Sequence, residues 1–143
     1  MGIRDRLIRL ISDGIDVRQI NDNSNKSILI RGCDPEMGRR AIELLTPVLG
    51  NPEMVAVTND DVFITELQKK KWSIIHFAPG ACRYDSTKSP IPGSRSQTKG
   101  WGLTEYRSLV KEYQGKDIKI VETAYEREII PLLLKALESI DEI

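Results

Sequence analysis

The sequence predicts an α/β fold: a three-layer sandwich built on a four-stranded parallel sheet, plus an N-terminal amphipathic helix. Short apolar runs alternate along the chain with segments of helical periodicity, which is the pattern of consecutive β–α units. The run "WSIIHFA" is apolar almost throughout, as are strands that helices cover on both faces of a parallel sheet. A length of 143 residues is typical of one domain with one core.

The N-terminal segment 1–12 is predicted to be a short helix. Its apolar side chains recur at helical spacing, at Ile3, Leu7, Leu10 and Ile11. A helix this short is marginal alone, so we expect it to pack on the domain or on a second subunit. The stretch "INDNSNK" is then a polar linker, which divides the chain into a helix and linker, 1–25, and one α/β domain, 26–143.

Four apolar runs are predicted as the strands of the sheet. They are "KSILIRG", with its strand at 27–31, then "EMVAVT", "WSIIHFA" and "IKIVETA". Right-handed crossovers between successive β–α units make all four parallel. We expect the first strand to lie beside both the second and the third, because that reversal of strand order creates the switch point of such sheets.

The first helix of the domain has a clear beginning and end. Asp34 can cap it, Pro35 suits its first position, and "GNP" stops it. Its inward-facing side chains are expected to be Met37, Ala41, Leu44, Leu45 and Val48.

The remaining helices carry similar signals. Asn59 or Asp60 can cap a helix through "DVFITELQKKK". Thr104 can cap "LTEYRSLVKEYQG", and Gly115 ends it. In "EREIIPLLLKALESI", Pro131 is tolerated only in the first turn, so that helix has to begin close to it.

Charge and cysteine content argue against several classes of function. Lys plus Arg and Asp plus Glu both number 21, and a net charge of zero argues against binding nucleic acid through bulk electrostatics. No apolar run approaches 18 residues, so we expect no association with a membrane. The two cysteines have no CxxC spacing and His76 has no metal-ligand pattern around it, so we expect a reduced, cytoplasmic protein without a metal site.

A ligand site is expected at the carboxyl ends of the strands, where open parallel sheets bind their ligands. Those ends carry "RGCDPEMG", the segment 79–102 and "ETAYER". The candidate ligand-binding residues are Gly32, Cys33, Asp34, Gly80, Cys82, Arg83, Ser94, Arg95, Lys99, Glu122 and Thr123.

The long basic loop 79–102 favours anions. Its Lys and Arg side chains outnumber the single Asp85, and Gly80 and Gly93 let backbone N–H groups approach a ligand closely. Loops this long are usually functional or disordered. The loop is therefore either a flap over a nucleotide or phosphate-type ligand, or a solvated insertion.

Cys33 and Cys82 each come directly after a strand, and these two strands should be neighbours in the sheet. Arg31 and Arg83 beside them would favour the thiolates of a redox pair or a nucleophile. Alternatively both are small apolar residues at the edge of a core. We expect them close together, without a disulfide.

Two polar residues within strands also have two interpretations. His76 has no acid or hydroxyl at a motif spacing, so a packed histidine is favoured over a catalytic base. Glu122 interrupts an apolar strand end, and lies either at the mouth of the site or in an ion pair with a basic loop residue.

The order of elements resembles the receiver domain of bacterial response regulators, a flavodoxin-like or Rossmann-like sandwich. "ILIRGCDPEM" resembles the receiver's first strand, acidic cluster and Pro-capped helix, and "ELQKKKWSIIHFAPG" its second helix and third strand. "GLTEYRSLVKEY" and "IKIVETAYERE" resemble the next helix and strand, with Thr123 at the strand end. The resemblance covers residues 27–137.

The receiver's catalytic positions differ here. Its paired metal-binding acids fall on Gly32 and Cys33, which leaves Asp34, and its phosphate-accepting aspartate falls on Phe77 or Ala78. The fifth strand with its lysine is missing from the pattern. Without these carboxylates neither Mg²⁺ coordination nor an acyl phosphate is expected, so the resemblance implies a pseudo-receiver that docks or senses.

A second segment, "WSIIHFAPGACR", is similar to the strand and loop of caspase-like CHAT protease domains. That family's catalytic histidine falls on Gly80 and its cysteine near Tyr125. The resemblance therefore implies a shared strand–loop geometry and no proteolysis.

We expect a non-catalytic regulatory or binding module that recognises a partner, or a nucleotide or phosphate-type ligand, at the carboxyl edge of the sheet. One alternative is a small enzyme acting on a nucleotide or phosphorylated metabolite, with the loop as a lid and Cys82, Asp34 or Glu122 in the chemistry. Another is a structural subunit that binds a protein partner, or a second copy, through its N-terminal helix. The sequence indicates no particular cofactor.

Overall fold

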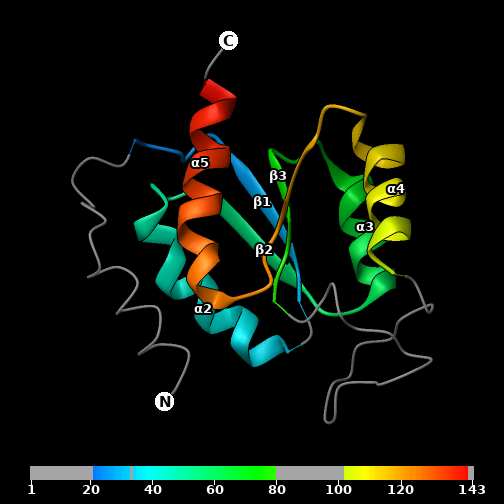
Figure 1. Ribbon diagram of the computed structural model, residues 1–143, viewed down its shortest axis with the longest axis horizontal. Helices are drawn as coiled ribbons and strands as arrows, with labels where there is room; N and C mark the ends of the chain where they lie inside the picture. Colours follow the sequence, from blue (N-terminus) through cyan, green and yellow to red (C-terminus); the bar gives the residue numbers. More distant parts are fainter. Residues whose placement is uncertain (1–20, 33, 80–101, 142–143) are drawn as a thin grey trace.

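The four strands form one parallel sheet (Figure 1). The computed structural model describes residues 21–32, 34–79 and 102–141. The strands are β1 (Ser27–Arg31), β2 (Glu53–Val57), β3 (Ile74–Phe77) and β4 (Lys119–Glu122), in the order β2-β1-β3-β4. β1 pairs in parallel with both β2 and β3, and β3 pairs in parallel with β4. The predicted strand order, with its switch point between β1 and β3, is confirmed.

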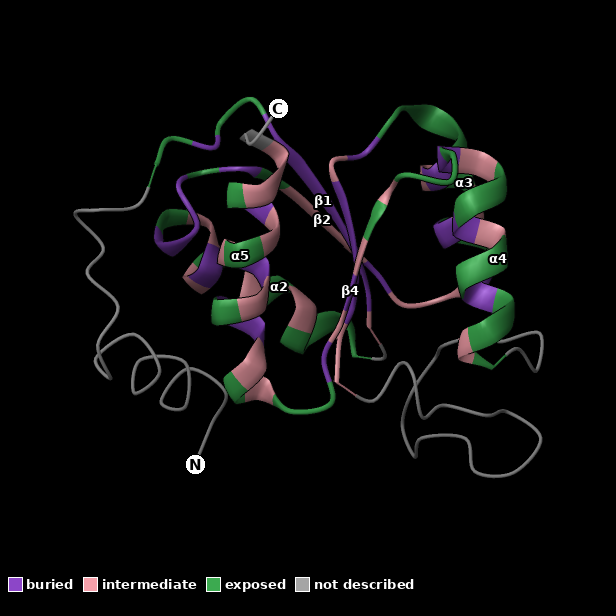
Figure 2. Ribbon diagram, turned by 45° about the horizontal axis from the view of Figure 1, so that its top comes forward, coloured by how far each residue is buried: buried purple, intermediate pink, exposed green. Residues whose placement is uncertain are grey.

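Helices cover both faces of the sheet. They are α2 (Pro35–Val48), α3 (Asp60–Lys69), α4 (Leu103–Gln114) and α5 (Ile129–Asp141), with a 3₁₀ turn, η3 (Glu126–Glu128), before α5. α2 and α5 lie on one face, α3 and α4 on the other, and the strands run between them, with β1 and β3 buried throughout (Figure 2). This is the predicted three-layer sandwich of the flavodoxin or Rossmann type. The predicted helix at 1–12 lies outside the described residues.

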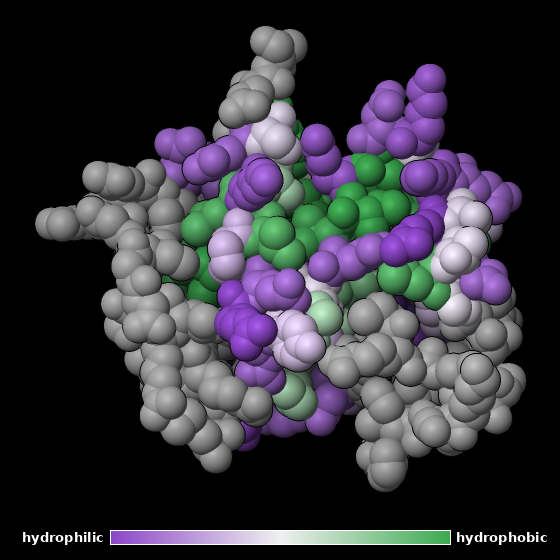
Figure 3. All heavy atoms as spheres, in the orientation of Figure 1, coloured by the Kyte–Doolittle hydropathy of each residue, from purple (hydrophilic) through white to green (hydrophobic). Residues whose placement is uncertain are grey.

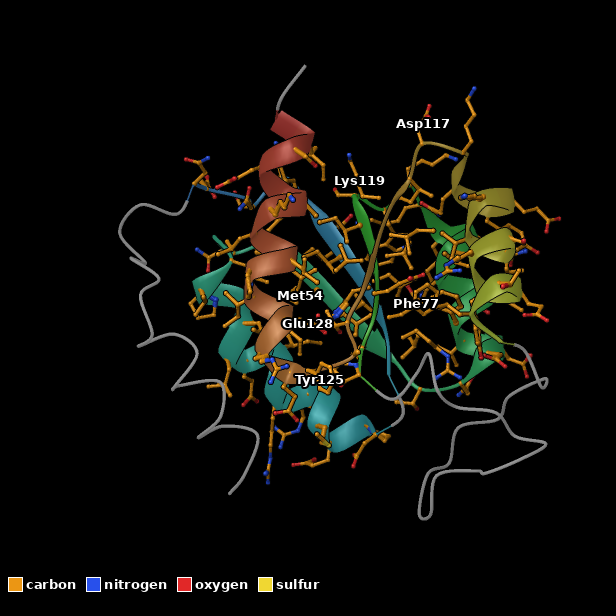
Figure 4. All side chains as sticks on the ribbon, viewed as in Figure 1. Met54, Phe77, Asp117, Lys119, Tyr125 and Glu128 are labelled. Carbon is orange, nitrogen blue, oxygen red and sulfur yellow. The ribbon has the colours of Figure 1, made fainter. Side chains whose placement is uncertain are left out.

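Alternation along the strands supplies two hydrophobic cores. Successive side chains of a strand point to opposite faces, so Ile74 and His76 of β3 face α2 and α5. Ile75 and Phe77 face α3 and α4. Figure 4 labels Phe77 on the α3–α4 side of the sheet. His76 thus stands in a row of otherwise apolar side chains.

The first turn of α2 is held by its predicted cap. Asp34 Oδ1 accepts hydrogen bonds from the backbone N–H groups of Glu36 and Met37, at 2.9 and 3.3 Å. The expectation that Met37 faces the core is wrong, because its side chain is 39% exposed. Met37 sits in this first turn beside a cavity, and the packed core begins further along α2.

Close contact between α2 and β2 depends on Gly38. A Cβ atom at this position would come within 3.1 Å of the Cβ atom of Ala56, closer than ordinary van der Waals contact. Glycine therefore lets the helix approach the strand, and the two residues together form part of the wall of the cavity.

Most of the other predicted helix boundaries agree with the structure. Asn59 caps α3, since its Oδ1 accepts from the Val62 N–H at 2.8 Å. Gly115 ends α4 with a left-handed φ of 96°, which glycine adopts without strain. Pro131 is the third residue of α5 and lies in its first turn, as predicted.

The predicted cap of α4 is wrong. The helix begins at Leu103 after Gly102, and Thr104 lies inside the first turn. The Glu105 carboxylate accepts from the Gly102 N–H at 3.1 Å, so an acidic side chain of the first turn stabilises this end.

The end of the stretch "INDNSNK" is packed against the domain. Asn23 and Lys26 are 3% and 5% exposed. Asn23 donates to the Leu49 carbonyl at 2.7 Å, and Lys26 donates to the Asn23 side chain at 2.6 Å. These hydrogen bonds connect the segment that precedes β1 to the end of α2.

One face of the molecule shows apolar atoms between α5 and α4, over the edge of the sheet at β4 (Figure 3).

Within the described ranges, no helix has both the length and the apolar character needed to cross a membrane.

Candidate functional site

A cavity of about 250 Å³ lies at the carboxyl edge of the sheet. Its wall comes from the ends of β1, β2 and β3, the first turns of α2, and the start of α5. The wall is mainly apolar, through Ile30, Ala41, Leu45, Ala56, Ala78 and Ile129. A concave, largely apolar space with a few polar groups is the usual form of a small-molecule site.

Four polar side chains also line this cavity: Asp34, Thr58, His76 and Glu126. Two are carboxylic acids, and none of the lining residues described is a lysine or arginine. Asp34 is engaged with the first turn of α2, as described above. His76 is the polar group that the sheet itself places at the cavity.

The hydrogen bonds of His76 fix where its proton lies. The side chain is 2% exposed, and its Nε2 lies 2.9 Å from Thr123 Oγ1. Thr123 Oγ1 in turn lies 3.2 Å from the Phe77 carbonyl oxygen, which can only accept. The threonine hydroxyl therefore donates to the carbonyl and accepts from histidine. Nε2 carries the proton in this assignment, and Nδ1 has a bare lone pair.

Nδ1 of His76 has no hydrogen-bond partner among the described residues. The two ring nitrogens point away from each other, so with Nε2 on Thr123, beyond the end of β4, Nδ1 faces away from β4. The cavity is lined from β1, β2 and the end of β3, and no residue of β4 lines it. Nδ1 is thus a buried, unpartnered acceptor on a residue that lines the cavity.

The environment keeps this imidazole neutral. Burial lowers the pKa of His76 from 6.5 to about 4, because the apolar surroundings disfavour the charged form. At neutral pH the side chain is an acceptor at Nδ1 and a donor at Nε2.

The structure brings three of the predicted site residues to this region. Gly32 and Asp34 line the cavity. Thr123 is fully buried and holds His76 from the side of β4.

Glu122 is directed elsewhere. Its carboxylate accepts two hydrogen bonds from Arg107 of α4, at 2.6 and 2.7 Å. Of its two predicted interpretations the ion pair is the one observed, with an arginine of a helix as the partner.

The other predicted site residues lie outside the described ranges: Cys33, Gly80, Cys82, Arg83, Ser94, Arg95 and Lys99. The proximity of the two cysteines and the anion-binding flap therefore stay predictions. Within the described ranges, no three His, Cys, Asp or Glu side chains are grouped closely enough to hold a metal ion.

A charged cluster that the sequence did not predict lies on the opposite face of the sheet, at the same edge. Arg31, Asp60 and Tyr106 are at most 3% exposed. Asp60 Oδ1 lies 3.0 Å from Arg31 Nη2 and 2.6 Å from the Tyr106 hydroxyl. Burial, and then the hydrogen bond to Asp60, raise the pKa of Tyr106, so it remains a donor. The feature of the sequence that could have indicated this cluster is Arg31, a charged residue at the end of the apolar strand β1.

Comparison of the chain with known proteins found no matching family model, no matching curated protein and no matching solved structure.

Proposed function

We propose that the protein is a non-catalytic binding module whose cavity at the carboxyl edge of the sheet takes a small molecule. The observation that carries this proposal is the buried, unpartnered Nδ1 of His76 beside an apolar cavity. Buried polar atoms nearly always have a hydrogen-bond partner, and a small molecule in the cavity would supply one to this nitrogen.

The size of the cavity limits the ligand. An engineered apolar cavity of about 150 Å³ binds benzene. A cavity of about 250 Å³ therefore suits a compact ligand of one substituted ring or two small fused rings.

The protonation of His76 favours binding over catalysis. A general base works best when its pKa lies near the pH of the reaction. With a pKa of about 4, His76 accepts a hydrogen bond at neutral pH but takes up a proton poorly. A ligand can thus be held without being deprotonated, as a sensing or docking module requires.

The charged groups around the cavity argue against the phosphate-type ligand that the basic loop led us to expect. Asp34 occupies the backbone N–H groups at the start of α2, and a second carboxylic acid, Glu126, lines the same wall. The described lining therefore favours an uncharged ligand. A nucleotide or phosphate ligand, and the pseudo-receiver role, would have to draw on residues 80–101.

Filling the cavity tests this proposal. Ala41 lines the cavity, and Ala41→Leu adds bulk from a helix where leucine is well tolerated. We expect phenol, used as a probe, to bind about tenfold or more weakly to this variant, because overpacking displaces the ligand. The measurement is titration of phenol by two-dimensional NMR, following the amides of Gly32, Gly38 and Thr58.

The matched control is Ala136→Leu. This alanine of α5 packs against the same core and does not line the cavity. It should leave the affinity for phenol unchanged. If phenol and indole both fail to perturb the lining amides of the parent protein, the proposed function is wrong.

A further inference from the structure

Thr123 determines which atom of His76 a ligand meets. Its hydroxyl accepts from Nε2 and donates to the Phe77 carbonyl, so both of these groups are satisfied within the sheet. Turning the ring over would take Nε2 away from Thr123 and leave a buried N–H unpaired. The histidine therefore cannot offer its N–H to the cavity without losing a hydrogen bond, and presents an acceptor there.

A bare acceptor in an apolar cavity discriminates between ligands. A ligand with a hydroxyl or N–H group can pair with Nδ1, whereas an isostere without that group leaves the nitrogen buried and unpaired. Sites built around such a polar group reject the analogue that lacks the partner more strongly than an apolar wall rejects a missing methylene.

The carboxylic acids on the wall add a condition on charge. Asp34 and Glu126 line the same cavity as His76, and no lysine or arginine is among the lining residues described. A ligand anion brought next to these groups would meet like charge. A neutral donor avoids this repulsion.

Building on the proposed function, we infer that the ligand is a neutral, mainly apolar ring compound that donates a hydrogen bond from a hydroxyl or N–H group to Nδ1 of His76. His76 is the specificity-determining residue, and Thr123 is the positioning residue that keeps Nδ1 free of a proton.

Matched probes test this inference on the parent protein. Phenol and toluene have nearly the same shape and differ by a hydroxyl in place of a methyl group. Both should perturb the amides that line the cavity. Phenol alone should shift the ¹⁵N resonance of Nδ1 of His76, because only phenol donates a hydrogen bond to it. Benzoate, an anion of similar size, should bind more weakly than phenol.

Two variants separate the ring nitrogens. His76→Gln keeps a donor close to Thr123 and removes Nδ1, and His76→Asn keeps a polar atom close to the position of Nδ1. The preference for phenol over toluene should fall by about 10- to 100-fold in His76→Gln. His76→Asn should retain more of this preference than His76→Gln does. A general loss of packing would not produce this difference between the two variants.

The outcomes distinguish the inference from the proposed function. The inference is overturned if three results occur together: phenol and toluene both bind, the ¹⁵N resonance of Nδ1 does not shift, and His76→Gln keeps the preference for phenol. The cavity would then remain a binding site. If no neutral probe perturbs the lining amides, the proposed function itself fails. The Nδ1 measurement needs no variant, so it decides the matter even where a substituted protein does not fold.

Discussion

Asp60→Ala is expected to lower the free energy of unfolding by about 3–5 kcal/mol, the range found when one partner of a buried ion pair is removed. Arg31 is 2% exposed and Asp60 is fully buried, and their side chains are joined at 3.0 Å. Tyr106 donates to the same carboxylate oxygen at 2.6 Å. The substitution therefore removes the carboxylate that accepts from both Arg31 and Tyr106. The buried guanidinium of Arg31 then no longer has this carboxylate to offset the cost of its desolvation.

Denaturant unfolding of parent and variant gives this difference directly. The control is Asp61→Ala, which removes a carboxylate from the next position of α3, where the residue is exposed. It should cost less than about 1 kcal/mol, since an acidic group at a helix N-terminus contributes no more than that at the surface. A loss at Asp60 as small as the loss at Asp61 would contradict the assignment of a buried, tightly coupled cluster.

Acidification is expected to remove about 3 kcal/mol of stability through His76 alone between pH 7 and pH 4. Burial lowers the pKa of the folded side chain to about 4 from its ordinary value of 6.5. Between these values the unfolded chain binds the proton and the folded chain does not. The contribution of His76 is therefore complete above pH 6.5 and is lost as the pH falls toward 4.

The parent protein and His76→Gln, unfolded in denaturant at several pH values, isolate this contribution. Carboxylic acids elsewhere titrate in both proteins, so the difference between the two curves reports on His76. The parent should lose more stability than the variant as the pH falls through this interval. Parallel curves would mean that His76 is no harder to protonate in the folded state than in the unfolded state.

Much of the fold could be predicted because its signals are local. Asp34 and Pro35 mark the start of α2, and the run at 74–77, apolar except for His76, marks a central strand, whatever the rest of the chain does. The right-handed crossover rule then leaves few possible strand orders. The errors were also local: Thr104 is a good capping residue, but Glu105 stabilises a start two residues earlier.

The candidate site was predictable in position but not in chemistry. The rule for parallel sheets placed it at the carboxyl edge, where Gly32 and Asp34 do line a cavity. The role of His76 depends on Thr123, 47 residues further along the chain. The link between Arg31 and Asp60 spans 29 positions. No spacing within a motif reveals such contacts, because the pairing of the strands creates them.

A crystal structure of the protein soaked with phenol shows directly whether the cavity binds a small molecule through His76. We expect phenol between Ile30, Ala41 and Leu45, with its oxygen within about 3 Å of Nδ1. Thr123 should still lie within hydrogen-bond distance of Nε2. If the cavity holds only ordered water molecules, one of them bonded to Nδ1, then solvent satisfies the buried acceptor and the cavity is not a site for such a ligand.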